Sequence, residues 1–594
     1  MKQFLITAAG VFVGLVLFLV GVPVLLISMA ASSSSGEVTP DQAVLNLDLR
    51  QNLTDQASNN PLAALRGGSL SVMTIISTLR HAETDDRVKA LLIRLPEGGM
   101  EPAAADEIRA AIKHFKAAGK PVLAHSQGLY PSGMVTSTYA VGTAGDELWM
   151  QPGASFQVTG LANEDIFFKR LFDKYGVKAD YEQRYEFKNA VNPYLHDNYT
   201  DAHREAELGW MGSVYKTATS AAAADRKQTP DAMTKALEAG PYLAEAALKL
   251  HLIDKVGQVK DAEEAILAKA GTDSQLYDFQ DYARSARGPD TGVGPAIAVV
   301  EAEGPIVTGN DGGGGNPFSG ESTIYSDTMA QALYSAIEDQ DVKAIVMRVN
   351  SPGGSDTASE QILAAVRTAK AVGKPVVVSM GTYAASGGYW ISSQASAIVA
   401  QPSTLTGSIG VFGGKFALGE ALARYGVDVR QIGVGSSYAG AFGMSREFSP
   451  KERAAFAGWM DQIYSNFVLR VAEGRKLPEA RVRDIAKGRV WTGEQAQKLG
   501  LVDQVGGFYD AVDKAKTLAN LKGDVRLKSM STQMSPIQAL KHAMGVSATS
   551  VRTLAAAAWV LGDPRAQGIL DQIADERLRG QVGGAAVLAP RPVH

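Results

Sequence analysis

Short runs of apolar residues alternate with amphipathic stretches along most of the chain. In the second half, the apolar runs at 296–300, 344–349 and 375–379 predict strands, and the amphipathic stretches 326–338 and 359–371 predict helices. Strands separated by helices are typical of right-handed βαβ crossovers and a largely parallel sheet. The pattern therefore predicts an α/β fold, with function at the glycine-rich turns that follow the strands.

The same pattern occurs twice. Val88–Arg94 (VKALLIR) returns as Val342–Arg348 (VKAIVMR), at an offset of 342 − 88 = 254 residues, and Gly119–Leu123 returns as Gly373–Val377 at the same offset. This period is far too long for a solenoid, so it indicates a duplicated domain. The predicted units are a first copy at 32–285, a second copy at 286–527 and a C-terminal extension at 528–594 that has no partner in the first copy.

The N-terminus is strongly apolar. Residues 4–31 carry no charge, whereas about 20 apolar residues suffice to span a bilayer and a cleavable signal has an apolar core of roughly 7 to 15. We interpret residues 1–31 as a single transmembrane anchor, although Ser28-Met29-Ala30 resembles a cleavage site and leaves removal open. Lys2 precedes the span and the next basic residue is Arg50. The positive-inside rule then places the body in the periplasm of a Gram-negative cell, on the inner (cytoplasmic) membrane.

Composition argues against several kinds of chemistry. The 594 residues include no cysteine, which excludes thiolate metal sites and a cysteine nucleophile, and the net charge of −4 gives no reason to expect nucleic acid. None of the eight histidines lies between Leu252 and Lys541. With no His-Glu-x-x-His pattern either, we expect no metal and no cofactor.

A serine in the second copy has the surroundings of a nucleophile. Small residues flank Ser386 in the segment 383–390 (YAASGGYW), so the backbone can turn sharply and expose the hydroxyl, as in the Gly-x-Ser-x-Gly elbow. The backbone N–H groups of Gly353 and Gly354, together with that of Gly387, would form an oxyanion hole. From the residues alone, an ordinary turn and an ordinary loop remain alternatives.

Without a nearby histidine, Ser386 needs another base. A lysine in apolar surroundings is the natural candidate, because burial lowers its pKa and leaves it neutral. Lys188 has such neighbours in Phe187, Ala190 and Val191, but from the residues alone it is one of many lysines. Two other readings stay open. One is a crotonase-type enzyme acting on acyl-CoA, which the predicted anchor disfavours because coenzyme A is cytosolic, and the other is a catalytically silent membrane scaffold.

Three stretches, Arg348–Gly354, Ala384–Trp390 and Pro402–Gly410, carry a family resemblance. They are similar to signal peptide peptidase A of the long, duplicated (67K) type, in peptidase family S49, and the resemblance covers roughly residues 1 to 525. It implies two tandem Clp/crotonase-like domains, a homotetramer on the membrane, and a serine endopeptidase. The implied substrates are remnant signal peptides and similar apolar peptides.

The resemblance also implies that Ser386 is the nucleophile, that Lys188 is the general base and that Ser408 orients the lysine. Comparing the copies agrees with this division. The first-copy counterpart of Ser386 is Ser132, whose surroundings have lost the paired alanines and one glycine, and Tyr438 stands opposite Lys188. We expect the first copy to supply the base and the second the nucleophile and oxyanion loop. Cleavage preference, the role of 528–594, and whether the two groups belong to one chain remain open.

Overall fold

The computed structural model describes residues 39–57, 70–286, 294–310, 322–523, 525–530 and 585–588. The predicted anchor at 1–31 lies outside the described residues. Within these ranges, no helix is long and apolar enough to cross a membrane. The boundaries predicted for the two copies and the C-terminal extension remain predictions.

The first copy is built on a parallel sheet with the strand order β8-β4-β3-β2-β1-β9. Its central strands are nearly continuous runs of buried residues, as expected where helices cover both faces of a parallel sheet. The strands are β1 (Ala43–Asp48), β2 (Val88–Arg94), β3 (Val122–Ser126), β4 (Glu147–Met150), β8 (Lys255–Val256) and β9 (Gln275–Asp278).

The second copy repeats this sheet strand for strand, in the order β20-β16-β15-β13-β10-β21 and again parallel. Even an irregularity recurs, because the pairing register shifts directly after Ala43 in the first sheet and after Ala296 in the second. The predicted duplicated α/β architecture is therefore confirmed. The strands are β10 (Ala296–Glu303), β13 (Val342–Ser351), β15 (Val376–Ala385), β16 (Ala397–Ala400), β20 (Gln504–Val505) and β21 (Arg526–Ser529), extended beyond β15 by β17 (Leu405–Gly407) and β19 (Val490–Thr492).

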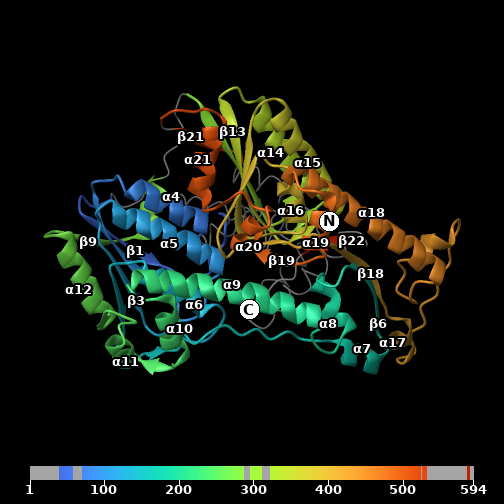
Figure 1. Ribbon diagram of the computed structural model, residues 1–594, viewed down its shortest axis with the longest axis horizontal. Helices are drawn as coiled ribbons and strands as arrows, with labels where there is room; N and C mark the ends of the chain where they lie inside the picture. Colours follow the sequence, from blue (N-terminus) through green and yellow to red (C-terminus); the bar gives the residue numbers. More distant parts are fainter. Residues whose placement is uncertain are drawn as a thin grey trace, which may run out of the picture.

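Helices and sheets stack in alternating layers (Figure 1). Each sheet has a layer of several helices on one face and a single helix on the other. In the second copy this single helix is α21, which packs between its own sheet and the helices of the first copy. One apolar cluster therefore extends through both copies, and a second lies within the second copy. The first-copy helices are α4 (Val72–Ala82), α5 (Pro102–Ala117) and α6 (Val135–Thr143) on one face and α12 (Val259–Ala270) on the other, with α13 (Phe279–Ala286) at the edge. The second-copy helices are α14 (Ser326–Glu338), α15 (Asp356–Ala371), α16 (Gly387–Ser392) and α21 (Phe508–Leu518).

Most predicted elements of the second copy are present, with shifted ends. The helix predicted at 326–338 matches α14, whereas α15 begins three residues before the predicted 359. It does so because Ser355 caps it, with its Oγ accepting from the N–H of Ala358. Strands β13 and β15 run several residues beyond their predicted ends, into the two glycine-rich motifs.

Two segments, called arms here, join the copies: the first arm is residues 178–225 of the first copy, and the second arm is residues 411–475 of the second copy. Strand β6 (Lys178–Arg184) of the first copy pairs antiparallel with β18 (Val411–Ala417) of the second over their full lengths. The long helix α9 (Asp201–Asp225) runs beneath both copies from α10 toward α8 (Figure 1). The pairing of β6 with β18 places the chain segment that follows β6 against the second copy. The remaining elements are β5 (Ser155–Phe156), α7 (Lys169–Tyr175), α8 (Asn192–Leu195), α10 (Pro230–Glu238), β7 (Tyr242–Leu243), α11 (Ala244–Lys249), β11 (Ile306–Val307), β12 (Ile324–Tyr325), β14 (Gly353–Gly354), α17 (Gly419–Ala423), α18 (Pro450–Arg475), α19 (Glu479–Ile485), α20 (Gly493–Lys498) and β22 (Ala585–Leu588).

A buried ion cluster joins the copies at their interface. The guanidinium of Arg348, on β13, donates to Asp55 at 2.9 Å and to Glu107 at 2.7 Å, and both carboxylates come from the first copy. All three side chains are nearly inaccessible to solvent. Removing one partner of such a cluster leaves an uncompensated buried charge, so the cluster fixes how the copies meet.

Candidate active site

Ser386 lies at a sharp turn between a strand and a helix. Strand β15 ends at Ala385, α16 begins at Gly387, and Ser386 between them has φ 58° and ψ −117°. A positive φ is strained for a residue with a side chain and costs on the order of 1–3 kcal/mol. The Ser386 N–H donates to the carbonyl of Gly407 at 2.8 Å, which pins the turn to the end of β17.

The glycines of the serine motif allow two strands to approach closely. A Cβ at Gly387 would lie 2.9 Å from the backbone nitrogen of Gly354, and one at Gly388 would lie 2.6 Å from the carbonyl oxygen of Ser351. Side chains at these positions would push β14 and the end of β13 away from the turn. The motif therefore packs the Gly353–Gly354 strand directly against the backbone that follows Ser386.

Lys188 reaches this turn from the first copy. Its Nζ lies 2.7 Å from Oγ of Ser386 and 2.9 Å from Oγ of Ser408, and it donates to the carbonyl oxygen of Ser408 at 3.1 Å. All three residues are fully buried. Burial lowers the pKa of Lys188 well below its usual 10.5. The three side chains predicted for catalysis thus meet within one chain.

A loop that the sequence did not single out holds the lysine in place. The Phe187 N–H donates to the carbonyl of Lys487, and the next residue, Gly488, has φ +82° and so little room that a Cβ would lie 2.6 Å from Cβ of Lys188. The following residue, Arg489, accepts at its carbonyl from the Ser408 N–H at 2.8 Å. The only sequence signal was an isolated glycine, which alone predicts no chemistry.

The predicted oxyanion donors differ in their surroundings. The N–H of Gly353, at φ 106°, donates to Oγ of Ser351 at 3.2 Å. Gly354 has no room for a side chain, because a Cβ would lie 2.0 Å from the carbonyl oxygen of Ile306. Gly354 is packed against Gly387 at the turn of Ser386, while the Gly353 N–H already has a hydroxyl partner.

A polar network links strands β10, β13 and β15 of the second copy to the first copy. Oδ1 of Asn350 accepts from the Tyr383 N–H at 3.0 Å, and its Nδ2 donates to Glu303 at 3.1 Å. The Glu303 carboxylate also accepts from the N–H groups of Asp55 and Gln56. Burial, with the nearby charge of Asp55, raises the pKa of Glu303 to about 7. The strand leading to Ser386 is therefore held by a side chain that the first copy anchors.

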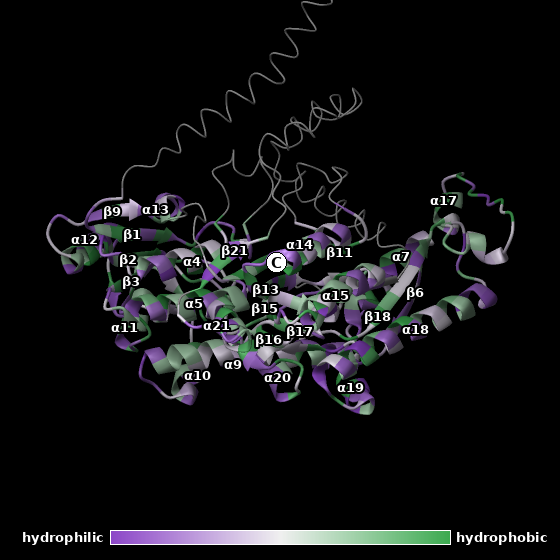
Figure 2. Ribbon diagram, turned by 90° about the horizontal axis from the view of Figure 1, so that it is seen from above, coloured by the Kyte–Doolittle hydropathy of each residue, from purple (hydrophilic) through white to green (hydrophobic). Residues whose placement is uncertain are grey.

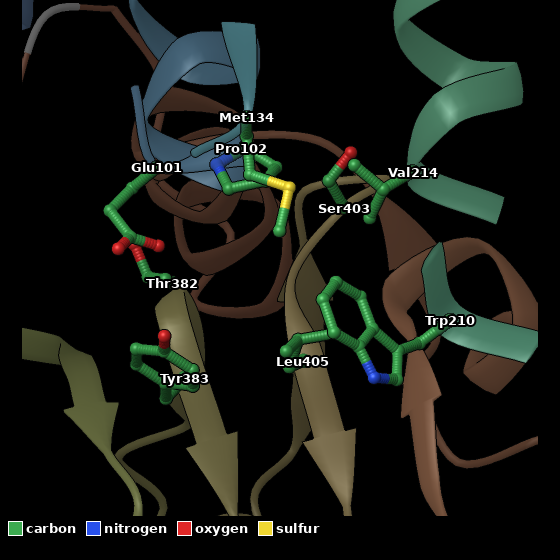
Figure 3. A pocket seen from close by; sticks show the side chains of 9 residues that line it. All are labelled: Glu101, Pro102, Met134, Trp210, Val214, Thr382, Tyr383, Ser403 and Leu405. Carbon is green, nitrogen blue, oxygen red and sulfur yellow. The ribbon is translucent and has the colours of Figure 1, made fainter. Parts of the chain in front are cut away.

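The corresponding serine of the first copy lacks these features. Ser132 is exposed, and the Gly99 N–H donates to its carbonyl at 2.7 Å. The counterpart of Lys188, Tyr438, stacks edge-on with Phe442 in the second arm. Met134, two residues after Ser132, lines a small, mainly apolar pocket at the seam of the copies together with Tyr383 (Figure 3). The loop around Ser132 therefore contributes Met134 to a pocket that strands β15 and β17 of the second copy also line.

The arrangement can activate a hydroxyl without a metal or an imidazole. A neutral amine within hydrogen-bond reach of a serine can take its proton, and the strained turn holds the resulting nucleophile in place. Across the part of the chain that the structure describes, no group of three or more metal-binding side chains occurs. A serine hydroxyl beside a buried amine is an arrangement that suits acyl transfer.

Known proteins are similar to this chain in sequence. The family model of peptidase family S49 matches residues 114–273 and 368–522, one match in each copy. Protease 4 of Salmonella typhi is 34% identical over 85% of this chain and 83% of its own, and Protease 4 of Haemophilus influenzae is 32% identical over 88% and 86%. The chloroplastic serine protease SPPA of Arabidopsis thaliana is 27% identical over 86% and 75%. With both copies matched and relatives aligned over most of its length, the chain belongs to peptidase family S49 and is a serine protease of the Protease 4/SppA group.

Proposed function

We propose that this chain is a serine endopeptidase that works through a dyad of Ser386 and Lys188. The observation that supports it most directly is the 2.7 Å separation of Lys188 Nζ from Ser386 Oγ, in a site where burial lowers the pKa of the lysine. An ordinary lysine, with a pKa of about 10.4, is only about 0.1% neutral at pH 7.4 and would be a poor base. Ser408, which touches the amine through both its hydroxyl and its carbonyl, would orient it.

The reaction would proceed in two halves. Lys188 takes the proton of the Ser386 hydroxyl as its oxygen attacks a peptide carbonyl carbon, and the N–H groups of Gly354 and Gly387 stabilise the oxyanion, with Gly353 as a third candidate. The C–N bond breaks, the lysine gives its proton to the leaving amine, and an acyl-enzyme remains. Water, deprotonated by Lys188, then attacks the ester, and Ser386 is regenerated with release of the acid.

We further propose that the substrates are remnant signal peptides and similar apolar peptides, cleaved at the periplasmic side of the inner membrane. The support is the uncharged segment 4–31, which is long enough to anchor the chain, and the family resemblance. The Clp/crotonase-like form of the two domains belongs to the same proposal. Fractionation of cells expressing the full chain or a chain starting at Ser32 tests the anchor, which predicts membrane and soluble fractions respectively.

A homotetramer is the proposed assembly. Its support, besides the resemblance, is an apolar tip near α17 that projects from one end of the molecule (Figure 2). There Ile432 is 98% exposed, Val434 94% and Tyr425 74%. Large apolar side chains gathered on a surface are typical of an interaction site. Light scattering of the wild type and of Ile432→Glu/Val434→Glu tests this, and an unchanged mass would argue against this contact.

The decisive experiment compares Ser386→Ala, Lys188→Ala and wild type against casein, a signal peptide and an acyl-CoA panel. We expect both variants to lose peptide hydrolysis while keeping the wild-type circular dichroism spectrum, and no acyl-CoA turnover. A fluorophosphonate probe should label wild-type Ser386 and fail on Lys188→Ala. Near wild-type hydrolysis by either variant would refute the dyad, and turnover of acyl-CoA alone would favour the crotonase reading.

A further inference from the structure

The pairing of β13 with β15 is interrupted just before the two glycine-rich motifs. The register shifts between Val349 and Ser351, so that Asn350 alone stands opposite residues 381–383 of β15. An irregularity of this kind leaves backbone groups of the longer segment without a partner in the ladder. The Asn350 side chain supplies one such partner, because its Oδ1 accepts from the Tyr383 N–H at 3.0 Å. A side chain therefore bridges the two strands where their backbones do not pair.

A carboxylate fixes the orientation of this amide. Nδ2 of Asn350 donates to Oε1 of Glu303 at 3.1 Å, and Glu303 lies opposite Asn350 in the pairing of β10 with β13. The same carboxylate accepts from the N–H of Asp55 at 3.1 Å and from that of Gln56 at 3.0 Å. An ionised carboxylate only accepts hydrogen bonds, so it binds the nitrogen side of an amide and leaves the oxygen to point away. Glu303 therefore directs the Asn350 oxygen toward Tyr383, and the first copy holds Glu303 in place.

The bridge lies directly before both parts of the proposed site. Gly354 is four positions after Asn350, and Ser386 is three positions after Tyr383. Beyond the bridge the two segments meet again, because a Cβ at Gly387 would lie 2.9 Å from the backbone nitrogen of Gly354. The spacing between β14 and the serine turn is therefore set at one end by the glycine contact and at the other by the Asn350 side chain.

The sheet of the first copy is built without this bridge. Arg50 stands in the position of Glu303, and the loop 95–99 that follows β2 contains no asparagine. The counterpart of Tyr383, at 383 − 254 = 129, is Leu129, whose N–H donates to a backbone carbonyl of β5 instead. The same fold thus forms without an amide bridge between the strands. The bridge accompanies the copy that carries the buried serine, which indicates a role in the reaction rather than in folding.

We propose that Asn350 is a positioning residue of the peptidase, and that Glu303 orients it. The inference deepens the proposed peptidase function and rests on it. Asn350 acts through the two strands, by setting the distance between the oxyanion donors and Oγ of Ser386. Those donors stabilise the transition state more than the bound substrate, so their displacement should lower kcat and leave KM nearly unchanged. A misplacement of about 1 Å costs on the order of 100-fold in rate, and we expect a loss of about 10- to 100-fold without the bridge.

The test measures kcat and KM of full-length variants with a fluorogenic apolar peptide at pH 8.5. Asn350→Ala removes the bridge. Asn350→Asp keeps an acceptor for the Tyr383 N–H but sets a second carboxylate against Glu303, whose pKa of about 7 leaves it ionised at this pH. Both should lose about 10- to 100-fold in kcat. Adding Glu303→Gln to Asn350→Asp replaces the repulsion with an amide that can donate, and should raise kcat about tenfold over Asn350→Asp. Glu303→Gln alone completes the double-mutant cycle.

Ser379→Ala is the matched control. Its buried hydroxyl also bridges β13 and β15, by accepting from Arg348 at 3.0 Å, but it lies four positions farther from the serine turn than Tyr383. This variant should lower the urea midpoint and keep the wild-type kcat. If Asn350 variants behaved in the same way, or raised KM at unchanged kcat, the inference would be overturned. Should Asn350→Ala not fold, the comparison of Asn350→Asp with the double variant still decides. Failure of the proposed function would appear separately, as hydrolysis persisting in Ser386→Ala.

Discussion

Replacing Lys188 with methionine should abolish activity and yet stabilise the fold near neutral pH. If the amine is neutral in the folded protein at pH 7.4, folding removes a proton from a lysine whose unfolded pKa is about 10.4. That costs about 1.4 kcal/mol per pH unit, or about 4 kcal/mol. Methionine has a similar length and no such cost. It would, however, leave the two hydroxyls and the Ser408 carbonyl without their amine partner, which costs about 1–3 kcal/mol.

The net gain expected for Lys188→Met at pH 7.4 is therefore about 1–3 kcal/mol, and it should depend on pH. Because burial lowers the pKa of Lys188 in the folded state, the unfolded chain binds the proton at pH values where the folded chain does not. Wild-type stability accordingly rises with pH through that window. The advantage of the variant should shrink as pH rises, and turn into a loss near pH 10.

Urea denaturation followed by tryptophan fluorescence, at pH 7, 8, 9 and 10, measures this difference. The matched control is Lys216→Met, at an exposed position on α9, for which we expect no comparable trend. The activity of Lys188→Met should fall at least about 100-fold, as for loss of a general base. A stability difference that does not change with pH, or a variant that is less stable at pH 7, would show that the folded amine is charged and refute the reasoning.

Three further results are expected. The kcat/KM of the wild type should fall about tenfold per pH unit below the pKa of Lys188. Because burial lowers that pKa, the midpoint of this limb in a pH–rate profile should lie well below 10.5, and a midpoint near 10.5 would contradict the assignment. Ser132→Ala should keep full hydrolysis and full fluorophosphonate labelling, because that serine is exposed and lacks a lysine counterpart; loss of either would give the first copy a catalytic role. Arg348→Met should lower the urea midpoint by the equivalent of about 3–5 kcal/mol, since it strands two buried carboxylates, and a neutral effect would mean they become protonated instead.

The sequence predicted the elements that periodicity controls. Buried parallel strands are nearly continuous apolar runs, so β10, β13 and β15 were recognisable, and repetition of the runs revealed the duplication. Their ends were harder to place, because the extra residues of β13 and β15 are held by pairing with each other, as in Ser351 opposite Ala384, rather than by apolar character. The start of α15 depended on one capping hydroxyl, which a period of 3.6 does not detect.

The residues of the candidate site also differ in how well the sequence predicts them. The motif around Ser386 is a continuous stretch of sequence. Its small residues, which the close approach of β14 requires, can be recognised from the sequence alone. The residues that surround Lys188 are distant from it in the sequence. Gly488 lies about 300 positions after Lys188, and Ser408 lies about 220 positions after it. The same holds for Asp55 and Glu107, whose role follows only from their contact with Arg348. Single-residue signals of this kind become visible only when the two copies are packed together.

The packing also shows that the two copies that meet at Lys188 and Ser386 belong to the same chain. Strand β6 carries Lys188 onto the second copy of its own chain through its pairing with β18, so the side chains of Ser386 and Lys188 lie together without a second subunit. The second arm, which includes Tyr438 in place of a lysine, ends in the exposed apolar tip around Ile432. Its exposed side chains suit contact with a neighbouring molecule, whereas Tyr438 has no amine to offer an exposed serine such as Ser132. The lysine of the first copy and the serine loop of the second therefore complement each other within one chain.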